Sequence, residues 1–241
     1  MTTTPTTPST LPDCWQALKD VLDNGIDRVI LFGPPGTGKT YAGMNFGNVA
    51  TGSFRITCTE DMTNLQVDGA FMPTSDGKAF RWYEGSALKA WQAGGRLVVD
   101  EIDKAGSDVF ATLLNFLDSP ESASWEHPET GQIHRPKTGF SAVMTTNIED
   151  MNDLPEALSD RFPVRIRIDQ PHPNALKRLS KDLRDVAVNY ADAGTDRISL
   201  RSFMAFDNMR RALGDDKAAQ IVFGYRADGI MDALRVNAVA K

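Results

Sequence analysis

One run of residues places three glycines, a lysine and a threonine at fixed spacing: Gly33-Pro34-Pro35-Gly36-Thr37-Gly38-Lys39-Thr40. The run fits the pattern G-x-x-x-x-G-K-[ST] at every fixed position. Glycines allow the backbone to curl until several N–H groups point inward, an arrangement that binds phosphate oxygens. Lys39 would place an ammonium group on the outer phosphates, and the Thr40 hydroxyl would be a ligand of Mg²⁺. The run therefore predicts a binding loop for the phosphates of a nucleotide.

A pair of acids follows about sixty residues later, at the end of the apolar run 96–102. Asp100 would hold the water shell of the Mg²⁺ ion. Glu101 would polarise the attacking water as a general base, an effect of roughly 10²–10⁴ in rate. Two solvated acids at the end of a strand are the alternative. A phosphate loop in the same chain favours the catalytic interpretation.

The elements that must position these groups alternate between two patterns. Short strand-like runs alternate with helical stretches, and the continuously apolar ones among them suit strands that are covered on both faces. They lie at 29–32, 54–59, 96–102, 140–147 and 164–168. Helix candidates lie near 15–22 and at 39–49, 85–94, 107–118 and 154–161. This alternation predicts an α/β fold with a mostly parallel sheet sandwiched by helices, and the phosphate loop indicates the P-loop NTPase type of such a sheet.

A different pattern begins after Pro171–Pro173, where leucines recur at steps of three and four. Further helical stretches are expected at about 200–213, 215–224 and 228–238. We therefore expect three parts: a disordered Thr/Pro tail over 1–12, a nucleotide-binding α/β domain over 13–170, and a small all-α lid over 171–241. Hairpins are expected at 71–80 and 125–134, each around a turn that contains glycine.

Composition limits the choice of partner and compartment. The chain has 241 residues, a net charge of −6 and two cysteines, Cys14 and Cys58. An acidic chain has no general attraction for phosphate backbones, so a nucleic-acid partner is not favoured. No apolar run is long enough to span a bilayer, and the N-terminus lacks the pattern of a signal peptide. These features predict a cytoplasmic protein without a membrane partner.

Four motifs occur in an order that is similar to that of the AAA+ superfamily: GPPGTGKT, VVDEID, MTTN and LPEALSDRF. More narrowly, the chain resembles the dynein-related branch that contains MoxR-like, nitric-oxide-reductase-activating and Rubisco-activating ATPases. The resemblance covers about residues 26–205. It implies that ATP and Mg²⁺ are the cofactors and that the reaction is hydrolysis of ATP to ADP and phosphate. Adenine and guanine are not distinguished by these motifs.

The resemblance also implies catalytic roles for three further residues. Asn147 matches the sensor-1 position, which orients water against the γ-phosphate; the alternative is an asparagine that forms a turn. Arg161 matches the arginine finger, which reaches the nucleotide of a neighbouring subunit; the alternative is a salt bridge to Asp160 or Glu156. Arg201 matches sensor 2 on the lid, although three other arginines lie close in sequence and compete for that assignment: Arg197, Arg210 and Arg211.

A finger that acts on a neighbour implies a homo-oligomer, usually a closed ring, and the number in this family is six. Three functions are compatible with such a ring. The first is a MoxR-like remodeller or chaperone of protein complexes, with a protein client or a partner of the von Willebrand factor A type. The second is an ATP-driven motor or loader that acts on nucleic acid. The third is a nucleotide-gated assembly scaffold, against which the intact Asp100–Glu101 pair argues.

Overall fold

The computed structural model describes residues 11–191 and 193–239. These residues form two compact units, one made of 18–33 and 39–167, the other of 11–17, 34–38, 168–191 and 193–239. We call them the sheet unit and the helical unit. Most of the expected Thr/Pro tail lies outside the described residues.

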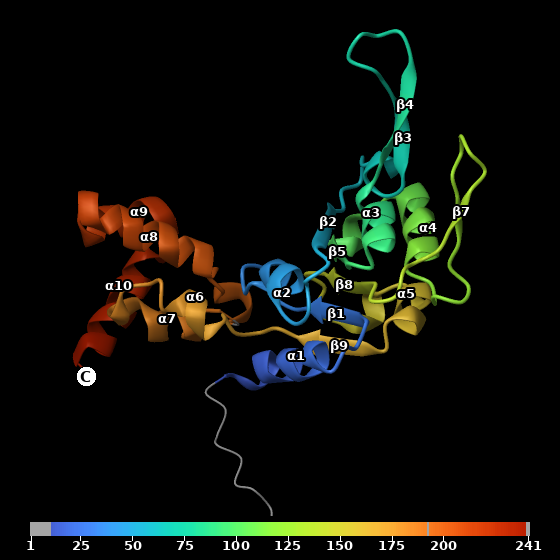
Figure 1. Cartoon of the computed structure of the whole chain (residues 1–241). Helices are drawn as coiled ribbons and strands as arrows, with labels where there is room; N and C mark the ends of the chain where they lie inside the picture. Colours follow the sequence, from blue (N-terminus) through green and yellow to red (C-terminus); the bar gives the residue numbers. More distant parts are fainter. Residues whose placement is uncertain (1–10, 192, 240–241) are drawn as a thin grey trace, which may run out of the picture. The chain divides into compact units, whose positions relative to one another are not determined.

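The sheet unit contains five parallel strands, in the order β2-β5-β8-β1-β9, within the part of the chain that the structure describes. Their bounds are Arg28–Phe32 for β1, Ser53–Thr57 for β2, Arg96–Asp100 for β5, Ser141–Thr145 for β8 and Val164–Arg167 for β9. Chain order and spatial order differ because the connections from β1 to β2 and from β8 to β9 pass strands that lie between them, whereas β2 to β5 and β5 to β8 join parallel neighbours. The predicted parallel α/β fold is confirmed (Figure 1).

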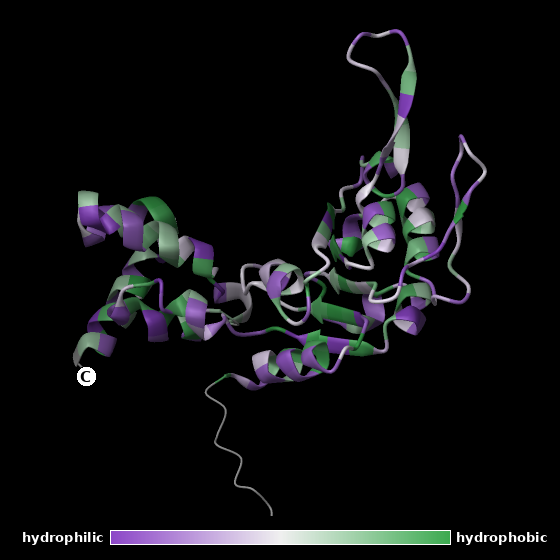
Figure 2. Cartoon of the chain, viewed as in Figure 1, coloured by the Kyte–Doolittle hydropathy of each residue, from purple (hydrophilic) through white to green (hydrophobic). Residues whose placement is uncertain are grey.

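Helices complete the sheet unit on both faces. They are α2 (Lys39–Asn45), α3 (Ser86–Ala93), α4 (Ser107–Phe116) and α5 (Glu156–Arg161), while α1 (Asp13–Asp23) belongs partly to each unit. Gly43 of α2 approaches Val98 and Val143, whereas the alternate residues Leu97 and Val99 join the core with α3 and α4. Strands covered on both faces must be apolar at successive positions, as the green strands β1 and β8 show in Figure 2.

Helix α2 ends at Asn45, four residues before the predicted end at 49. Gly47 has a φ of +70°, a left-handed conformation that stops a helix. The buried guanidinium of Arg96 donates to the carbonyls of Gly43, Phe46 and Asn48 around this end. A cation at the carboxyl end of a helix satisfies its free carbonyls and complements its dipole.

The two predicted hairpins are present, and both belong to the sheet unit. Strands β3 (Gly69–Pro73) and β4 (Phe80–Glu84) form the longer one, and β6 (Trp125–Glu126) and β7 (Ile133–His134) form the shorter one. Trp82 and Trp125 connect them, with ring centroids 5.7 Å apart, and the Trp125 indole donates to Asp68. Figure 1 shows the β3–β4 hairpin projecting from the sheet unit.

The helical unit forms its own core around Phe203, Phe206 and Phe223. Its helices are α6 (Pro173–Leu176), α7 (Arg184–Asn189), α8 (Leu200–Leu213), α9 (Asp215–Phe223) and α10 (Ala227–Val239). Asp207 is buried in this unit, where it accepts hydrogen bonds from Ser180 and forms an ion pair with Arg210. The expected all-helical composition of this region is therefore present. No helix among the described residues is both long enough and apolar enough to cross a membrane.

Candidate active site

The loop after β1 has the backbone that its glycines require. Gly33, Gly36 and Gly38 have φ values of +113°, +82° and +110°, which other residues rarely adopt. The Thr37 hydroxyl donates to the carbonyl of Pro34 across the loop at 3.1 Å. Pro35 lies between these positions and, like Pro34, offers no backbone N–H. The predicted loop is thus held in a tight curl by its own backbone and side chains.

Lys39 begins α2, and its side chain is buried against the loop. Its ammonium donates to the carbonyl of Gly33 at 2.8 Å and to the Asn147 amide oxygen at 3.1 Å. Asn147 follows β8, and its amide nitrogen donates to Glu101 at 3.4 Å. The structure therefore brings Lys39, at the start of α2, together with Glu101 and Asn147, which follow β5 and β8.

Asp100 is the most heavily hydrogen-bonded acid of the site. Its Oδ1 accepts from the hydroxyl of Thr40 at 2.7 Å and from the hydroxyl of Thr145. Its Oδ2 pairs with the guanidinium of Arg55 on β2. Burial alone would raise the pKa of Asp100, but the hydrogen bonds from Thr145, Thr40 and Arg55 outweigh it and hold the pKa below its ordinary value. The carboxylate therefore stays ionised.

Thr40 and Asp100 present a donor set that suits Mg²⁺. A hydroxyl oxygen and a carboxylate oxygen lie 2.7 Å apart at the end of the phosphate loop. Mg²⁺ prefers hard oxygen ligands, keeps several waters, and is bound through one or two protein groups together with phosphates. The residues present fit the metal, which would be held by Thr40 and Asp100 and would neutralise charge on the phosphates.

Glu101 has an unusual backbone conformation for a non-glycine residue. Its φ of 56° and ψ of 48° lie in the left-handed region, and it is the one such non-glycine residue among those that the structure describes. Its carboxylate pairs with Lys104 at 2.6 Å and remains partly exposed. Strained backbone is concentrated at functional sites, where a side chain must point in a set direction.

The structure does not bring the predicted finger, Arg161, to these residues. Its guanidinium donates to the carbonyl of Ala157 and lies 3.6 Å from the carboxylate of Asp118. The predicted alternative named the wrong acids, Asp160 or Glu156. Asp118, two residues beyond the end of α4, is the acid that pairs with it instead.

Arg201 lies on the first turn of α8 and is exposed. Ser199 caps that helix by accepting from the N–H of Ser202. Ser199 also packs on the phosphate loop, because a Cβ added to Gly36 would lie 2.9 Å from its Cβ. Within the helical unit, the start of α8 therefore abuts the loop, two residues before Arg201. The competing Arg210 is occupied by Asp182 and Asp207.

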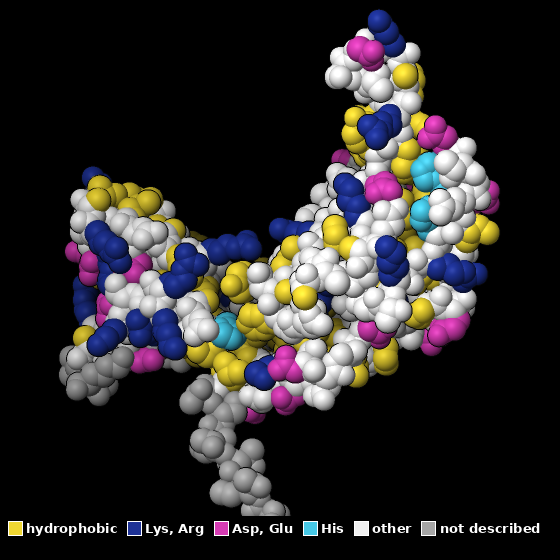
Figure 3. Space-filling view, viewed as in Figure 1, with side chains coloured by type: hydrophobic (Ala, Val, Ile, Leu, Met, Phe, Trp, Pro, Cys, Tyr) yellow, Lys and Arg dark blue, Asp and Glu magenta, His cyan; other side chains and the backbone are white. Residues whose placement is uncertain are grey.

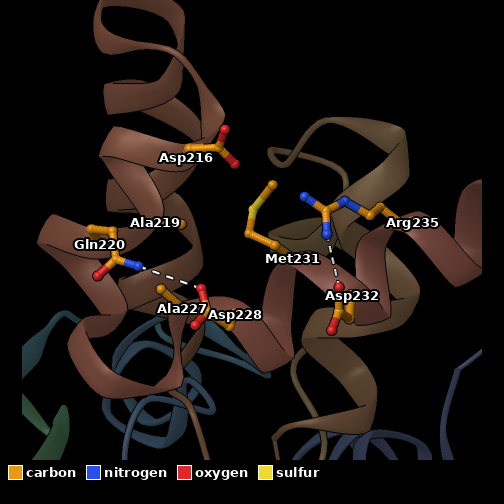
Figure 4. Close-up of a pocket in the computed structure, with 8 residues that line it drawn as sticks. All are labelled: Asp216, Ala219, Gln220, Ala227, Asp228, Met231, Asp232 and Arg235. Carbon is orange, nitrogen blue, oxygen red and sulfur yellow. Dashed lines mark hydrogen bonds and ion pairs between the residues drawn. The ribbon is translucent and has the colours of Figure 1, made fainter.

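A separate pocket of about 330 Å³ opens between α9 and α10 (Figure 4). Its polar groups pair within the pocket, Gln220 with Asp228 and Arg235 with Asp232. It contains none of the predicted site residues.

Sequence comparison places the site in a known family. The family described as AAA domain (dynein-related subfamily) matches residues 28–162, more than half of the chain, and the chain belongs to this family. The match includes the phosphate loop, the two acids, Asn147 and Arg161. The AAA+ resemblance is thereby confirmed.

Solved structures share the fold. The chain is similar to NtrX from Brucella abortus, with a TM-score of 0.56 and 15% identity, over 83% of this chain and 50% of that chain. NtrX from the same organism in complex with ATP gives a TM-score of 0.52 and 15% identity, over 87% of this chain and 50% of that one. NtrX in complex with ADP gives a TM-score of 0.53 and 14% identity, over 83% of this chain and 49% of that one. The chain thus spans about half the length of these proteins.

Proposed function

We propose that this chain binds Mg-ATP at the loop Gly33–Thr40 and hydrolyses it to ADP and phosphate. The observation that carries the proposal is the hydrogen-bonded set at the strand ends, in which Asn147 connects Lys39 to Glu101 and Asp100 contacts Thr40. A lysine, a metal-binding acid, a second acid and a polar amide are the groups that phosphoryl transfer to water requires. NtrX has been crystallised with ATP and with ADP, which supports a nucleotide as the ligand here.

Each residue has a role that its chemistry allows. The loop backbone and Lys39 hold the phosphates and stabilise the negative charge that develops during transfer. Glu101 accepts a proton from the attacking water, and Asn147 both donates to a phosphate oxygen and accepts from water. Asp100 and Thr40 hold the Mg²⁺ ion, which offsets phosphate charge. Arg201, which the family resemblance matches to sensor 2, is the candidate for a further cation.

The test is a binding titration of ATP, with Mg²⁺ present, against the parent and Lys39→Ala. Lys39→Ala should lose tight binding, because the ammonium on the outer phosphates is gone. Lys89→Ala on the exposed face of α3 removes the same charge away from the loop and should bind like the parent. Micromolar affinity in a folded Lys39→Ala variant would contradict the proposal.

We further propose that the chain assembles into a ring in which Arg161 completes the site of the next subunit. Kinetic measurements are the best test of this assembly. Six subunits are the number that the family resemblance implies. A ring requires Arg161 to exchange its partner Asp118 for phosphate. The contact at 3.6 Å between partly exposed groups is a weak one, so the exchange costs little.

The favoured biological role is remodelling of protein complexes in the cytoplasm, where ATP is available. The β3–β4 hairpin supports it, since its side chains include Phe71, Phe80 and Tyr83, with Phe80 71% exposed. Figure 3 shows hydrophobic side chains along the projecting hairpin and charged ones toward its tip. Exposed apolar side chains on a projection suit contact with a protein client or a von Willebrand factor A partner. Turnover measured with and without DNA would distinguish this role from a nucleic-acid motor.

A further inference from the structure

Arg55 forms an ion pair with Asp100 that the roles above do not use. It lies on β2, at the edge of the sheet, and Thr57 of the same strand is in register with Asp100 on β5. The Arg55 side chain is 46% exposed, whereas that of Asp100 is 7% exposed. A half-exposed cation therefore reaches inward to the carboxylate that is expected to hold the metal.

The hydrogen bonds on Asp100 show which oxygen Arg55 occupies. Oδ1 already accepts from the hydroxyls of Thr40 and Thr145. Each carboxylate oxygen has about two acceptor positions, so Oδ1 is saturated. Oδ2 is the oxygen that these hydroxyls leave open, and the guanidinium of Arg55 is on it. Arg55 holds one of the two acceptor positions of Oδ2, so a metal-bound water that approaches Asp100 comes to lie directly beside the guanidinium.

Charge acts in the same direction as this competition for lone pairs. A guanidinium is always protonated in proteins, so Arg55 keeps a positive charge beside the expected position of a dication. Because like charges repel, the positive charge of Arg55 disfavours binding of the metal ion close to it. Nucleotide phosphates bring further negative charge that attracts the dication and offsets the repulsion from Arg55.

We propose that Arg55 is an internal counter-ion that competes with Mg²⁺ for Asp100, so that the site accepts the metal together with the nucleotide and disfavours the free ion. This inference rests on the proposed Mg-nucleotide site. Displacement of Arg55 needs only rotation of an exposed side chain. The strand itself stays fixed, because Ile56 on its opposite face is buried in the core and Cys58, just after it, is buried too.

The experiment measures binding of Mn²⁺, a paramagnetic substitute for Mg²⁺, by electron paramagnetic resonance with a non-hydrolysable ATP analogue and without nucleotide. Arg55→Met should bind Mn²⁺ about tenfold more tightly, the change that Coulomb's law gives for one charge removed beside a solvent-exposed dication. Arg55→Gln keeps a donor without the charge and should change in the same direction. Arg81→Met, on the exposed hairpin, should match the parent.

Two further variants separate the possible failures. Asp100→Asn should lose Mn²⁺ in the presence of the analogue; if neither it nor the parent binds Mn²⁺ there, the proposed Mg-nucleotide site itself is wrong. If the parent binds and Asp100→Asn does not, an unchanged affinity in Arg55→Met and Arg55→Gln overturns only the competition. A weaker affinity restored by Arg55→Lys overturns it too, and makes Arg55 a residue that orients Asp100.

Discussion

Asp100 and Glu101 are adjacent acids whose surroundings make them different groups. Asp100 is 5% exposed and accepts hydrogen bonds through both oxygens, which suits a fixed metal ligand. Glu101 is partly exposed, contacts Asn147 and Lys104, and faces a site that water can enter. A general base must reach both a water molecule and the reacting group, so the more accessible acid is the one suited to that role.

The left-handed backbone at Glu101 gives a prediction that separates stability from turnover. Glu101→Gln and Glu101→Asn should both lower ATP turnover by about 10²–10⁴, because each removes the base. Both lose the ion pair with Lys104, so that loss cancels in the comparison. Asparagine tolerates a left-handed backbone better than glutamine does. The free energy of unfolding of Glu101→Asn should therefore be about 1 kcal/mol higher than that of Glu101→Gln.

Denaturant unfolding of the two variants, together with turnover and ATP binding, provides the measurement. Equal stabilities would mean that the backbone at this position is not strained. Turnover within a few-fold of the parent in Glu101→Gln would exclude Glu101 as the base. Both variants should still bind ATP, since neither changes the phosphate loop.

At the scale of elements, α2 is a short helix held at both ends. Its first residue, Lys39, belongs to the phosphate loop, and its last turn is bound by the guanidinium of Arg96. Arg96 is 4% exposed, and burial lowers its pKa from the ordinary value, yet an arginine remains charged at neutral pH. The same residue donates to the Ser141 hydroxyl at the start of β8. One cation thus fixes the helix against the two central strands that carry Asp100 and Asn147.

Arg96→Met should therefore destabilise the sheet unit, because it leaves several buried carbonyls without donors. A loss of about 2–4 kcal/mol in the free energy of unfolding is expected. Arg81→Met on the exposed hairpin is the matched control and should stay within about 0.5 kcal/mol of the parent. Chemical denaturation measures both. A near-neutral Arg96→Met would show that water satisfies these carbonyls and that α2 does not depend on Arg96.

Sequence patterns predict the phosphate loop and the two acids because each depends on residues that are neighbours in the chain. They fail at Arg55, although its alternation with Ile56 marks it as a residue on the polar face of a strand. Its partnership with Asp100 depends on β2 lying beside β5, and no local pattern reveals the order of strands. The partner of Arg161 is missed for a related reason, since Asp118 lies 43 positions earlier in the chain, just beyond α4. Contacts between residues far apart in the sequence can be assigned only once the fold is known.

At the scale of the whole molecule, the described chain has a phosphate loop and candidates for the metal-binding acid and the base, but its candidate finger contacts Asp118 rather than these residues. An arginine finger contributes roughly 10³–10⁵ to the rate of phosphoryl transfer. A subunit that lacks it should turn over slowly alone, so specific activity should rise with protein concentration as rings assemble. The same reasoning makes two defective variants complementary.

Lys39→Ala should lose ATP binding but keep its finger, and Arg161→Ala should bind ATP but lack one. Mixed in one ring, an Arg161→Ala subunit can receive Arg161 from a Lys39→Ala neighbour, and the mixture should recover part of the parent turnover. A mixture of Lys39→Ala with Glu101→Gln is the control. There the nucleotide-binding subunit receives a finger but still lacks the base, so it should remain inactive. Turnover that stays at the level of the single variants in every ratio of the first mixture would count against a finger acting between subunits.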